Sequence, residues 1–333
     1  MEDELGPPYE YTVGCCVSQQ QTIAILLAAY NGEKYLEEQL QSLLDQSYTH
    51  FHLFIRDDGS TDGTLSILDR FAKRYPEKMT LLPSGESLGA KGNFSALMAY
   101  VSAHRYVMFC DQDDVWMGNK IALTFAKMKE LEDEHGKMTP LLVHTDLKVA
   151  DAELQVIDPS FWHYSRLSPG RSHYFNRLVV QNVVTGCTMM LNNPLLKLSL
   201  PMPSEAIMHD WWIALSASAF GKIGIVKTPT IYYRQHSKNT LGAQNFHSLR
   251  TIRKGISQLL REKIEVPQKY LQAERFLEHH RNRFDGQQRD MLEAFLLQPK
   301  NRWARKRYTM LKYRFFKNGF LRNLAQFLFG INF

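Results

Sequence analysis

Strand-length apolar runs alternate with segments of helical periodicity through the first third of the chain. Residues 22–29 are almost continuously apolar, which is typical of a strand buried on both faces of a sheet. The order then repeats, with strands expected at 51–56, 79–82 and 106–110 and helices at 33–44, 63–74 and 91–104. Such repetition predicts an α/β fold with a mostly parallel sheet, right-handed crossovers and helices on the faces.

The helical segments also predict which side chains face the core. The predicted inward-facing residues are Leu36, Leu40, Leu43 and Leu44, then Leu65, Leu68 and Phe71, then Phe94, Leu97, Met98 and Val101.

A chain of 333 residues can form one large domain, or one domain with an appendage. We divide it into an N-terminal leader (1–21), an α/β domain (22–245) and a helical C-terminal region (246–333). The acidic N-terminus lacks the features of a signal peptide, and no apolar stretch reaches the roughly 18 residues of a membrane span. The cysteines show neither a disulfide framework nor a metal-type C-x-x-C, which indicates a reducing, cytoplasmic setting; they are Cys15, Cys16, Cys110 and Cys187.

Polar, mostly glycine-bearing turns follow each of the four expected strands, at 30–33, 57–63, 89–93 and 111–114. Ligands of open α/β sheets bind beyond the carboxyl ends of the strands, so these turns predict one shared site. The alternative is that they merely cap the following helices.

The turn Asp111-Gln112-Asp113-Asp114 is the most unusual of the four. Three carboxylates within four residues repel one another, and Mg²⁺ or Mn²⁺ is the natural neutralising partner at the end of a buried strand. A solvated acidic turn or a helix N-terminus is the alternative. The nearby Lys91 and the glycines favour a phosphate ester as ligand. Neither the P-loop pattern nor G-x-G-x-x-G occurs, so ATPase and dinucleotide fingerprints are unsupported.

These motifs resemble the nucleotide-sugar site of GT-A glycosyltransferases of family 2, and within it the chain is most similar to bacterial rhamnosyltransferases of cell-surface polysaccharide assembly. The resemblance covers about residues 22–245. It is carried by Ala28-Ala29-Tyr30-Asn31-Gly32-Glu33-Lys34-Tyr35-Leu36, Ile55-Arg56-Asp57-Asp58-Gly59-Ser60-Thr61-Asp62, Asp111-Gln112-Asp113-Asp114, and the segments 182–190, 208–212 and 233–236.

The resemblance implies a role for each site residue. Asp57 accepts the N3–H of a pyrimidine base, with Asp58 as the alternative, and Asp111 reaches the ribose or the metal. The metal set is Asp113, Asp111 and His236, holding Mg²⁺ or Mn²⁺, and Arg234 is a diphosphate partner. The full nucleotide-sugar set is Ala29, Tyr30, Asn31, Glu33, Asp57, Lys91, Asn93, Asp111, Gln112 and Arg234.

The resemblance assigns the catalytic base to Asp210, which takes the proton of the attacking acceptor hydroxyl. A helix N-cap is the alternative for Asp210, because residues 212–220 are predicted to be helical. One base opposite the leaving group implies inversion, so dTDP-β-L-rhamnose would give an α-rhamnoside. Asp114 is expected to cap the segment 115–129 rather than bind metal.

Several further residues carry smaller expectations. Trp116 is expected to pack beneath the site, and the Gly186 region to shape the acceptor side. Trp211 and Trp212 are expected either to stack on a sugar or to pack in the core. The remaining histidines are treated as structural or exposed, among them His144, His163, His173, His279 and His280.

The C-terminal region changes pattern to helices, expected at 249–260, 270–284 and 288–297. No acidic residue follows Glu293, and basic and aromatic residues interleave from 302 to 333. Such segments bind anionic membrane surfaces, which predicts a peripheral protein at the cytoplasmic face of the membrane, near a lipid-linked saccharide acceptor. Docking on the catalytic domain is the alternative. Nucleic acid is the competing partner, but no recognised binding motif supports it.

The favoured function is therefore an inverting glycosyltransferase that uses dTDP-L-rhamnose as donor and makes O-antigen or lipopolysaccharide saccharides. The same fold with a UDP-glucose or UDP-galactose donor is one alternative, and a non-catalytic polysaccharide-binding protein is another. The intact set of Asp57, Asp111, Asp113 and Asp210 argues against the non-catalytic protein.

Overall fold

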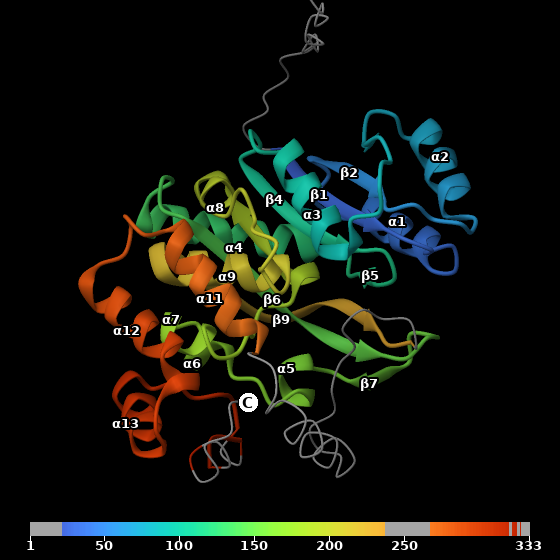
Figure 1. The fold of residues 1–333 in the computed structure, drawn as a ribbon. Coiled ribbons are helices and arrows are strands. Elements are labelled where there is room, and N and C mark those ends of the chain that lie inside the picture. Colours follow the sequence, from blue (N-terminus) through green and yellow to red (C-terminus); the bar gives the residue numbers. More distant parts are fainter. Residues whose placement is uncertain (1–21, 237–266, 320–321, 325–326, 328–333) are drawn as a thin grey trace, which may run out of the picture.

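The computed structural model describes residues 22–236, 267–319, 322–324 and 327 (Figure 1). The expected leader, the expected helix at 249–260 and most of the segment beyond 319 lie outside these residues.

A single mixed sheet of nine strands organises the described residues, in the order β3-β2-β1-β4-β8-β6-β9-β5 with β7 paired to β6. The strands β3, β2, β1 and β4 are mutually parallel, and β8 then runs antiparallel to both β4 and β6. The bounds are β1 Ile23–Ala29, β2 Phe51–Asp57, β3 Met79–Leu81, β4 Tyr106–Asp111, β5 Val115–Trp116, β6 Leu141–Ala150, β7 Val156–Asp158, β8 Met190–Asn192 and β9 Lys222–Arg234.

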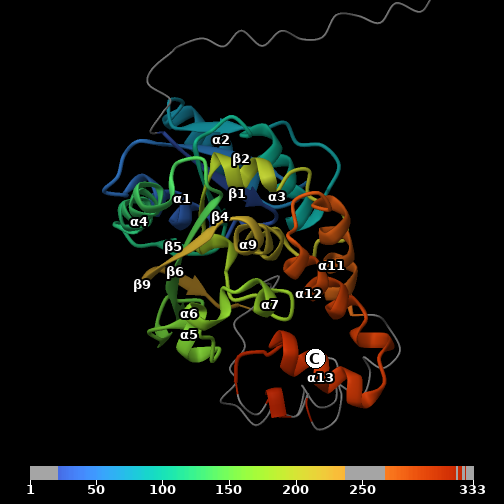
Figure 2. The same ribbon diagram turned by 90° about the vertical axis from the view of Figure 1, so that its left-hand side faces the viewer.

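Helices cover both faces of this sheet (Figures 1 and 2). Side chains of β1 alternate between two cores: Ala24 and Leu26 face the core of α3, α8, α9 and α11, whereas Ile25 and Leu27 face that of α1, α2 and α4. The helix bounds are α1 Leu36–Leu44, α2 Thr64–Arg74, α3 Gly89–Tyr100, α4 Lys120–His135, α5 Phe161–Tyr164, α6 Pro169–Ser172, α7 Phe175–Leu178, α8 Asn193–Leu198, α9 His209–Phe220, α11 Gln268–His279, α12 Gly286–Leu296 and α13 Trp303–Tyr313. The expected α/β class, a mixed sheet flanked by helices with a helical C-terminal extension, is confirmed.

Two details of the sequence prediction are wrong. Leu65 is 43% exposed, because Thr64 takes the inward position in the first turn of α2 and its hydroxyl accepts the Gly32 N–H at 2.8 Å. Asp114 caps no helix, because Val115–Trp116 forms strand β5 against β9 and α4 begins only at Lys120, with Asn119 as its N-cap. Leu44 is only partly buried, whereas Trp116 is buried as expected.

The C-terminal helices pack onto the side of the sheet that α9 covers. Phe276 of α11 meets the Trp212 ring edge-on at 5.1 Å, and α12 and α13 contribute Leu292, Phe295 and Met310 to the same core. In the described part of the chain, no helix is both long and apolar enough to cross a bilayer.

Candidate active site

Gln112 joins the turns that follow β1 and β4. Its side-chain oxygen accepts the Tyr30 N–H at 2.8 Å, and its amide nitrogen donates to the Tyr30 carbonyl at 2.7 Å. A Cβ on Gly32 would lie 2.3 Å from that oxygen, so a larger residue there would displace the Gln112 side chain. Tyr30 and Gln112 therefore lie together as expected, with the Tyr30 ring 55% exposed at the edge of the sheet.

Asn31 and Glu33 connect the first turn to the turn after β2. The Asn31 side-chain oxygen accepts the Thr61 N–H at 2.8 Å, and Glu33 accepts the Gly63 N–H at 3.0 Å. Asn31 holds a left-handed backbone with φ of 47°, a conformation that asparagine tolerates. Both residues lie at the predicted site, where their oxygens brace one loop against another.

Asp57 and Asp58 end β2 and are both buried. Asp57 accepts the Gly59 and Ser60 N–H groups at 3.0 and 2.8 Å and the Ser60 hydroxyl at 2.5 Å. Asp58 accepts the Leu88 N–H and the Arg56 guanidinium, both at 2.8 Å, and also the Ser87 hydroxyl and the Gly89 N–H. Burial opposes the ionisation of Asp58, but these donors outweigh it and its pKa is lowered.

Ala29, Asn93 and Lys91 complete the scaffold on this side. The Ala29 carbonyl accepts the Asp58 N–H at 2.8 Å, and the buried Asn93 amide donates to the Arg56 carbonyl at 3.0 Å. The Lys91 ammonium donates to the Ala206 carbonyl at 2.8 Å, which ties α3 to the segment that leads into α9.

A second group of acids, Asp111, Asp113, Asp114 and Asp210, is much less well satisfied; we call it the acid cluster. Burial, with the Asp113 and Asp210 charges, raises the pKa of Asp111 to about 7. Burial likewise raises the pKa of Asp210 to about 7. Asp114 is fully buried, and its Oδ2 has no hydrogen-bond partner, while Oδ1 accepts the Arg234 N–H at 3.2 Å. Its pKa is raised well above the usual range by burial and by Asp113.

Cys187 lies against this cluster, and the sequence reasoning missed it. Ligand atoms of Asp111, Asp114 and Cys187 all lie within 4.8 Å of one another. Burial, followed by the Asp114 and Asp111 charges, raises the pKa of the thiol. Its position directly after Gly186, in the Thr185-Gly186-Cys187-Thr188 segment of the family motif, could have identified it as a site residue. This Asp–Asp–Cys group could hold a metal ion.

His236 and Asp113, which were each expected to bind the metal, lie in contact. The His236 Nε2 lies 2.8 Å from the Asp113 Oδ2, and its ring stacks on Tyr35 at 4.9 Å. Arg234 is buried beside them: its Nε donates to the Asp113 carbonyl at 2.9 Å, and its guanidinium pairs with Glu38 and lies 4.5 Å over the Tyr35 ring. These contacts hold the acidic turn in place.

Asp210 lies in the first turn of α9, where Met208 rather than Asp210 is the N-cap. Its carboxylate accepts the Trp211 N–H at 2.6 Å and the Gly186 N–H. His209 is buried between the Phe94 and Phe109 rings, at 4.2 and 4.9 Å, and a Cβ on Gly186 would lie 2.8 Å from its Nε2. The Asp210 backbone is therefore held by close packing on both sides.

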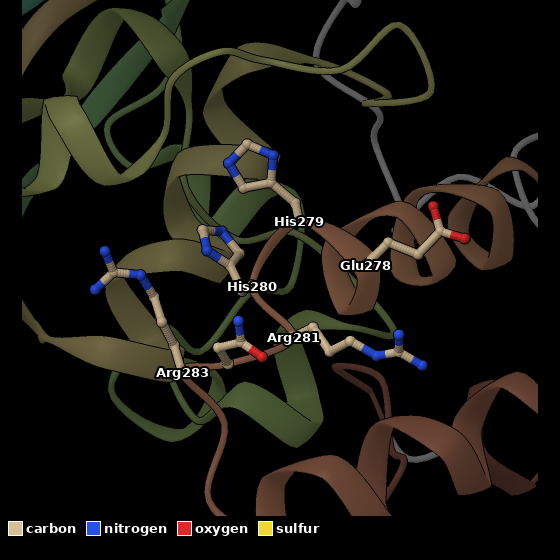
Figure 3. Close-up of a pocket in the computed structure, with 6 residues that line it drawn as sticks. Glu278, His279, His280, Arg281 and Arg283 are labelled. Carbon is tan, nitrogen blue, oxygen red and sulfur yellow. The ribbon is translucent and has the colours of Figure 1, made fainter.

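Trp211 and Trp212 pack against other parts of the protein, and four of the other histidines lie in two pairs. Trp212 is fully buried, and the Trp211 indole donates to the Leu178 carbonyl at 2.6 Å. His144 and His173 approach each other at 2.7 Å between their Nε2 atoms. His279 and His280 line a cavity of about 510 Å³ at the turn between α11 and α12, which no residue of the acid cluster lines (Figure 3).

The residues of the acid cluster fit a divalent cation. Several carboxylates converge, and the unpartnered Oδ2 of Asp114 is a buried acceptor of the kind that a hard cation satisfies. The buried ammonium nearby, Lys120, also has no hydrogen-bond partner, and burial lowers its pKa to about 8. The single positive charge of Lys120 does not neutralise all the carboxylates of the acid cluster.

Comparisons with known proteins agree with this chemistry. Residues 24–139 match the family described as glycosyl transferase family 2. The dTDP-rhamnosyl transferase RfbG of Shigella flexneri is 28% identical over 226 residues, which are 65% of this chain and 74% of that protein. The UDP-Glc:alpha-D-GlcNAc-diphosphoundecaprenol beta-1,3-glucosyltransferase WfgD of Escherichia coli is 29% identical over 106 residues, 32% of this chain and 40% of that protein.

Among solved structures, S. aureus TarS 1-349 in complex with UDP-GlcNAc aligns with a TM-score of 0.47 and 18% identity, over 88% of this chain and 80% of that one. The match to this family over residues 24–139 and the glycosyltransferase relatives, together with the α/β fold and the acids at its sheet edge, show that this chain is a glycosyltransferase.

Proposed function

We propose that this protein is an inverting glycosyltransferase that moves a sugar from a nucleotide donor to a saccharide hydroxyl. The observation that carries the proposal is the convergence of Asp111 and Asp210, which come from β4 and α9 and are 99 positions apart in the sequence. Burial, followed by the charges of Asp113 and Asp210, raises the pKa of Asp111 to about 7. Acids whose pKa values are shifted by burial and by each other are typical of catalytic sites.

Asp111, Asp113 and His236 are the proposed metal ligands. Asp114 and Cys187, whose ligand atoms lie within 4.8 Å of those of Asp111, are further candidate donors. Bound Mg²⁺ or Mn²⁺ would neutralise the charge that develops on the departing nucleoside diphosphate. Arg234 would hold the ligand-bearing turn through the Asp113 carbonyl.

Asp210 is the proposed general base. Its carboxylate takes the proton of the acceptor hydroxyl as that oxygen bonds to the anomeric carbon, while the bond from that carbon to the diphosphate breaks. A pKa of about 7 leaves a useful fraction of Asp210 ionised at neutral pH and still basic enough to accept a proton. Direct displacement of this kind inverts the anomeric centre.

For the donor, we propose dTDP-β-L-rhamnose, which would yield an α-rhamnoside. The support is the likeness to RfbG, whose printed name specifies a dTDP-rhamnosyl donor. A UDP-hexose is the second candidate, favoured by the likeness to WfgD. In either case Asp57, at the carboxyl end of β2, is the proposed contact for the pyrimidine base.

The acceptor we propose is a lipid-linked saccharide of O-antigen or lipopolysaccharide assembly, met at the cytoplasmic face of the membrane. WfgD, the relative named for transfer to a diphosphoundecaprenol-linked sugar, supports an acceptor of this class.

A donor screen tests the proposal. Hydrolysis of dTDP-L-rhamnose, UDP-glucose and UDP-galactose is measured with Mn²⁺ and with EDTA, together with the shift in melting temperature. We expect dTDP-L-rhamnose to give the largest response and EDTA to abolish it. A selective response to a UDP-sugar would identify that sugar nucleotide, rather than dTDP-L-rhamnose, as the donor. No response to any nucleotide would favour the non-catalytic alternative.

A further inference from the structure

The outward face of α13 combines exposed apolar side chains with cations. Ala304, Tyr308 and Leu311 recur at helical spacing, so they share one face, and Tyr308 and Leu311 are 63% and 55% exposed. Arg305 and Lys312 flank them on the same exposed side. A helix face that carries a tyrosine and a leucine at its centre and cations at its margin is unusual for a surface that only meets water.

The opposite face of α13 and the segment after it are firmly attached to the protein. Met310 is buried in the main core. The Asn176 amide donates to the Tyr313 carbonyl at 2.8 Å, Arg177 donates to the Phe316 carbonyl at 3.0 Å, and the Asn318 N–H donates to Gln181 at 2.8 Å. The expected alternative that this segment docks on the catalytic domain is therefore correct for its inner side, and docking leaves the outer side presented in a fixed orientation.

We infer that this outward face, defined by Ala304, Arg305, Tyr308, Leu311 and Lys312, is the surface with which the protein docks on an anionic lipid membrane. Charge complementarity favours this partner, since no acidic residue occurs between 294 and 333 and Arg302 and Arg314 add exposed cations around the face. Aromatic and aliphatic side chains flanked by cations insert at the boundary between lipid headgroups and acyl chains.

The same face lies on the base-bearing side of the molecule. Helix α7 lies between α9 and α13 in both views (Figures 1 and 2). It contacts both partners, because the Leu178 carbonyl accepts the Trp211 indole and Asn176 and Arg177 hold the segment after α13. Docking through α13 would thus set the acceptor side of Asp210 at a fixed position relative to the membrane. The inference deepens the proposed lipid-linked acceptor, but lipid binding is measured without donor or acceptor, so the two can fail separately.

Vesicle co-sedimentation of the full chain tests the inference. Point variants are preferable to removal of residues 300–333, because that deletion would also remove the contacts to α6 and α7. Each cation close to an anionic surface contributes about a fivefold factor in affinity, so Arg305→Gln/Lys312→Gln should weaken binding to phosphatidylcholine–phosphatidylglycerol vesicles by roughly 25-fold. Tyr308→Ser/Leu311→Ser should weaken it by about tenfold, through lost apolar insertion.

The matched control is Tyr100→Ser/Met138→Ser, which removes side chains that are 57% and 84% exposed and lie outside α13. It should bind vesicles like the wild type, and all variants should keep the wild-type melting temperature and donor hydrolysis. The inference is overturned if the α13 variants bind anionic vesicles as tightly as the wild type does, or if the wild type does not bind them. Salt-sensitive retention on RNA without vesicle binding would assign the face to nucleic acid instead, and would equally overturn it.

Discussion

Carboxylates at one edge of the sheet fall into two groups with opposite electrostatics. Asp58 and Asp62, in the turn after β2, are surrounded by hydrogen-bond donors that outweigh burial, and their pKa values are lowered. Asp114 is buried and Asp111 and Asp210 are half-buried, and in these three acids burial outweighs the donors nearby, so their pKa values are raised. The protein itself supplies the hydrogen-bond donors that the carboxylates of the first group need. The second could hold a metal ion, which is why we propose that the metal and the chemistry are located there.

Removal of the base should produce the largest effect. We expect Asp210→Asn to lower kcat by 10²- to 10⁴-fold, because the amide keeps the shape of the side chain but cannot accept the proton. Donor binding should remain close to that of the wild type. Asp133→Asn, an exposed position on α4, serves as the control. Residual activity above roughly a tenth of wild type would move the role of base to another residue.

A steric clash next to Asp210 should cause the second-largest loss of activity. In Gly186→Ala the new Cβ meets His209 at 2.8 Å, so the His209–Asp210 turn must shift. Since a misplacement of about 1 Å can cost 10²-fold in rate, we expect a loss of that order in kcat. Gly286→Ala, where nothing lies within 4 Å of the added Cβ, should leave kcat unchanged. Equal activity of the two variants would show that the turn does not position the base.

Variants of the metal ligands test the need for a cation. We expect Asp113→Ala to weaken Mn²⁺-dependent binding of dTDP by at least tenfold, and His236→Gln to weaken it by about 10- to 100-fold. Isothermal titration calorimetry with Mn²⁺ and with EDTA measures both. Unchanged affinity in Asp113→Ala would remove this residue from the proposed metal set.

Neutralisation of one acid in each group tests the comparison through stability. Asp58→Asn leaves the Arg56 guanidinium without its carboxylate, and we expect it to lower the free energy of unfolding by about 3 kcal/mol. Asp114→Asn removes a buried charge whose Oδ2 has no hydrogen-bond partner. Without added metal, it should leave the free energy of unfolding unchanged or raise it. Urea denaturation measures both variants, and equal destabilisation would erase the distinction between the groups.

The pH dependence of stability provides the smallest and most specific test. The pKa of Asp210 is raised in the folded protein to about 7, so its stabilising contribution is complete below its unfolded value near 4 and is lost as the pH rises through about 7. We expect Asp210→Asn to change the slope of unfolding free energy against pH by about 1.4 kcal/mol per unit between those values, in EDTA. An identical slope in the wild type and the variant would show that Asp210 titrates normally.

The sequence predicted the parts of the site that follow from strand order. Alternating apolar runs placed Asp57 and Asp111 at the carboxyl ends of parallel strands. In the structure these strands, β2 and β4, flank β1 on its two sides, and the two acids pair in register with its last residues. It did not predict the antiparallel strand β8, or that Cys187 would reach the acid cluster, because those contacts depend on pairing between distant segments. Asn93 and Lys91 illustrate a further gap: periodicity locates a polar side chain but does not reveal which backbone groups it binds.

The account depends most on a cation in the acid cluster. Titration of the protein with Mn²⁺ in the presence of dTDP, followed by the electron paramagnetic resonance signal of free Mn²⁺, tests this directly. We predict that the wild type removes one Mn²⁺ per chain from solution beyond what dTDP alone binds, and that Asp113→Ala does not. Equal free Mn²⁺ with and without the wild-type protein would contradict the account.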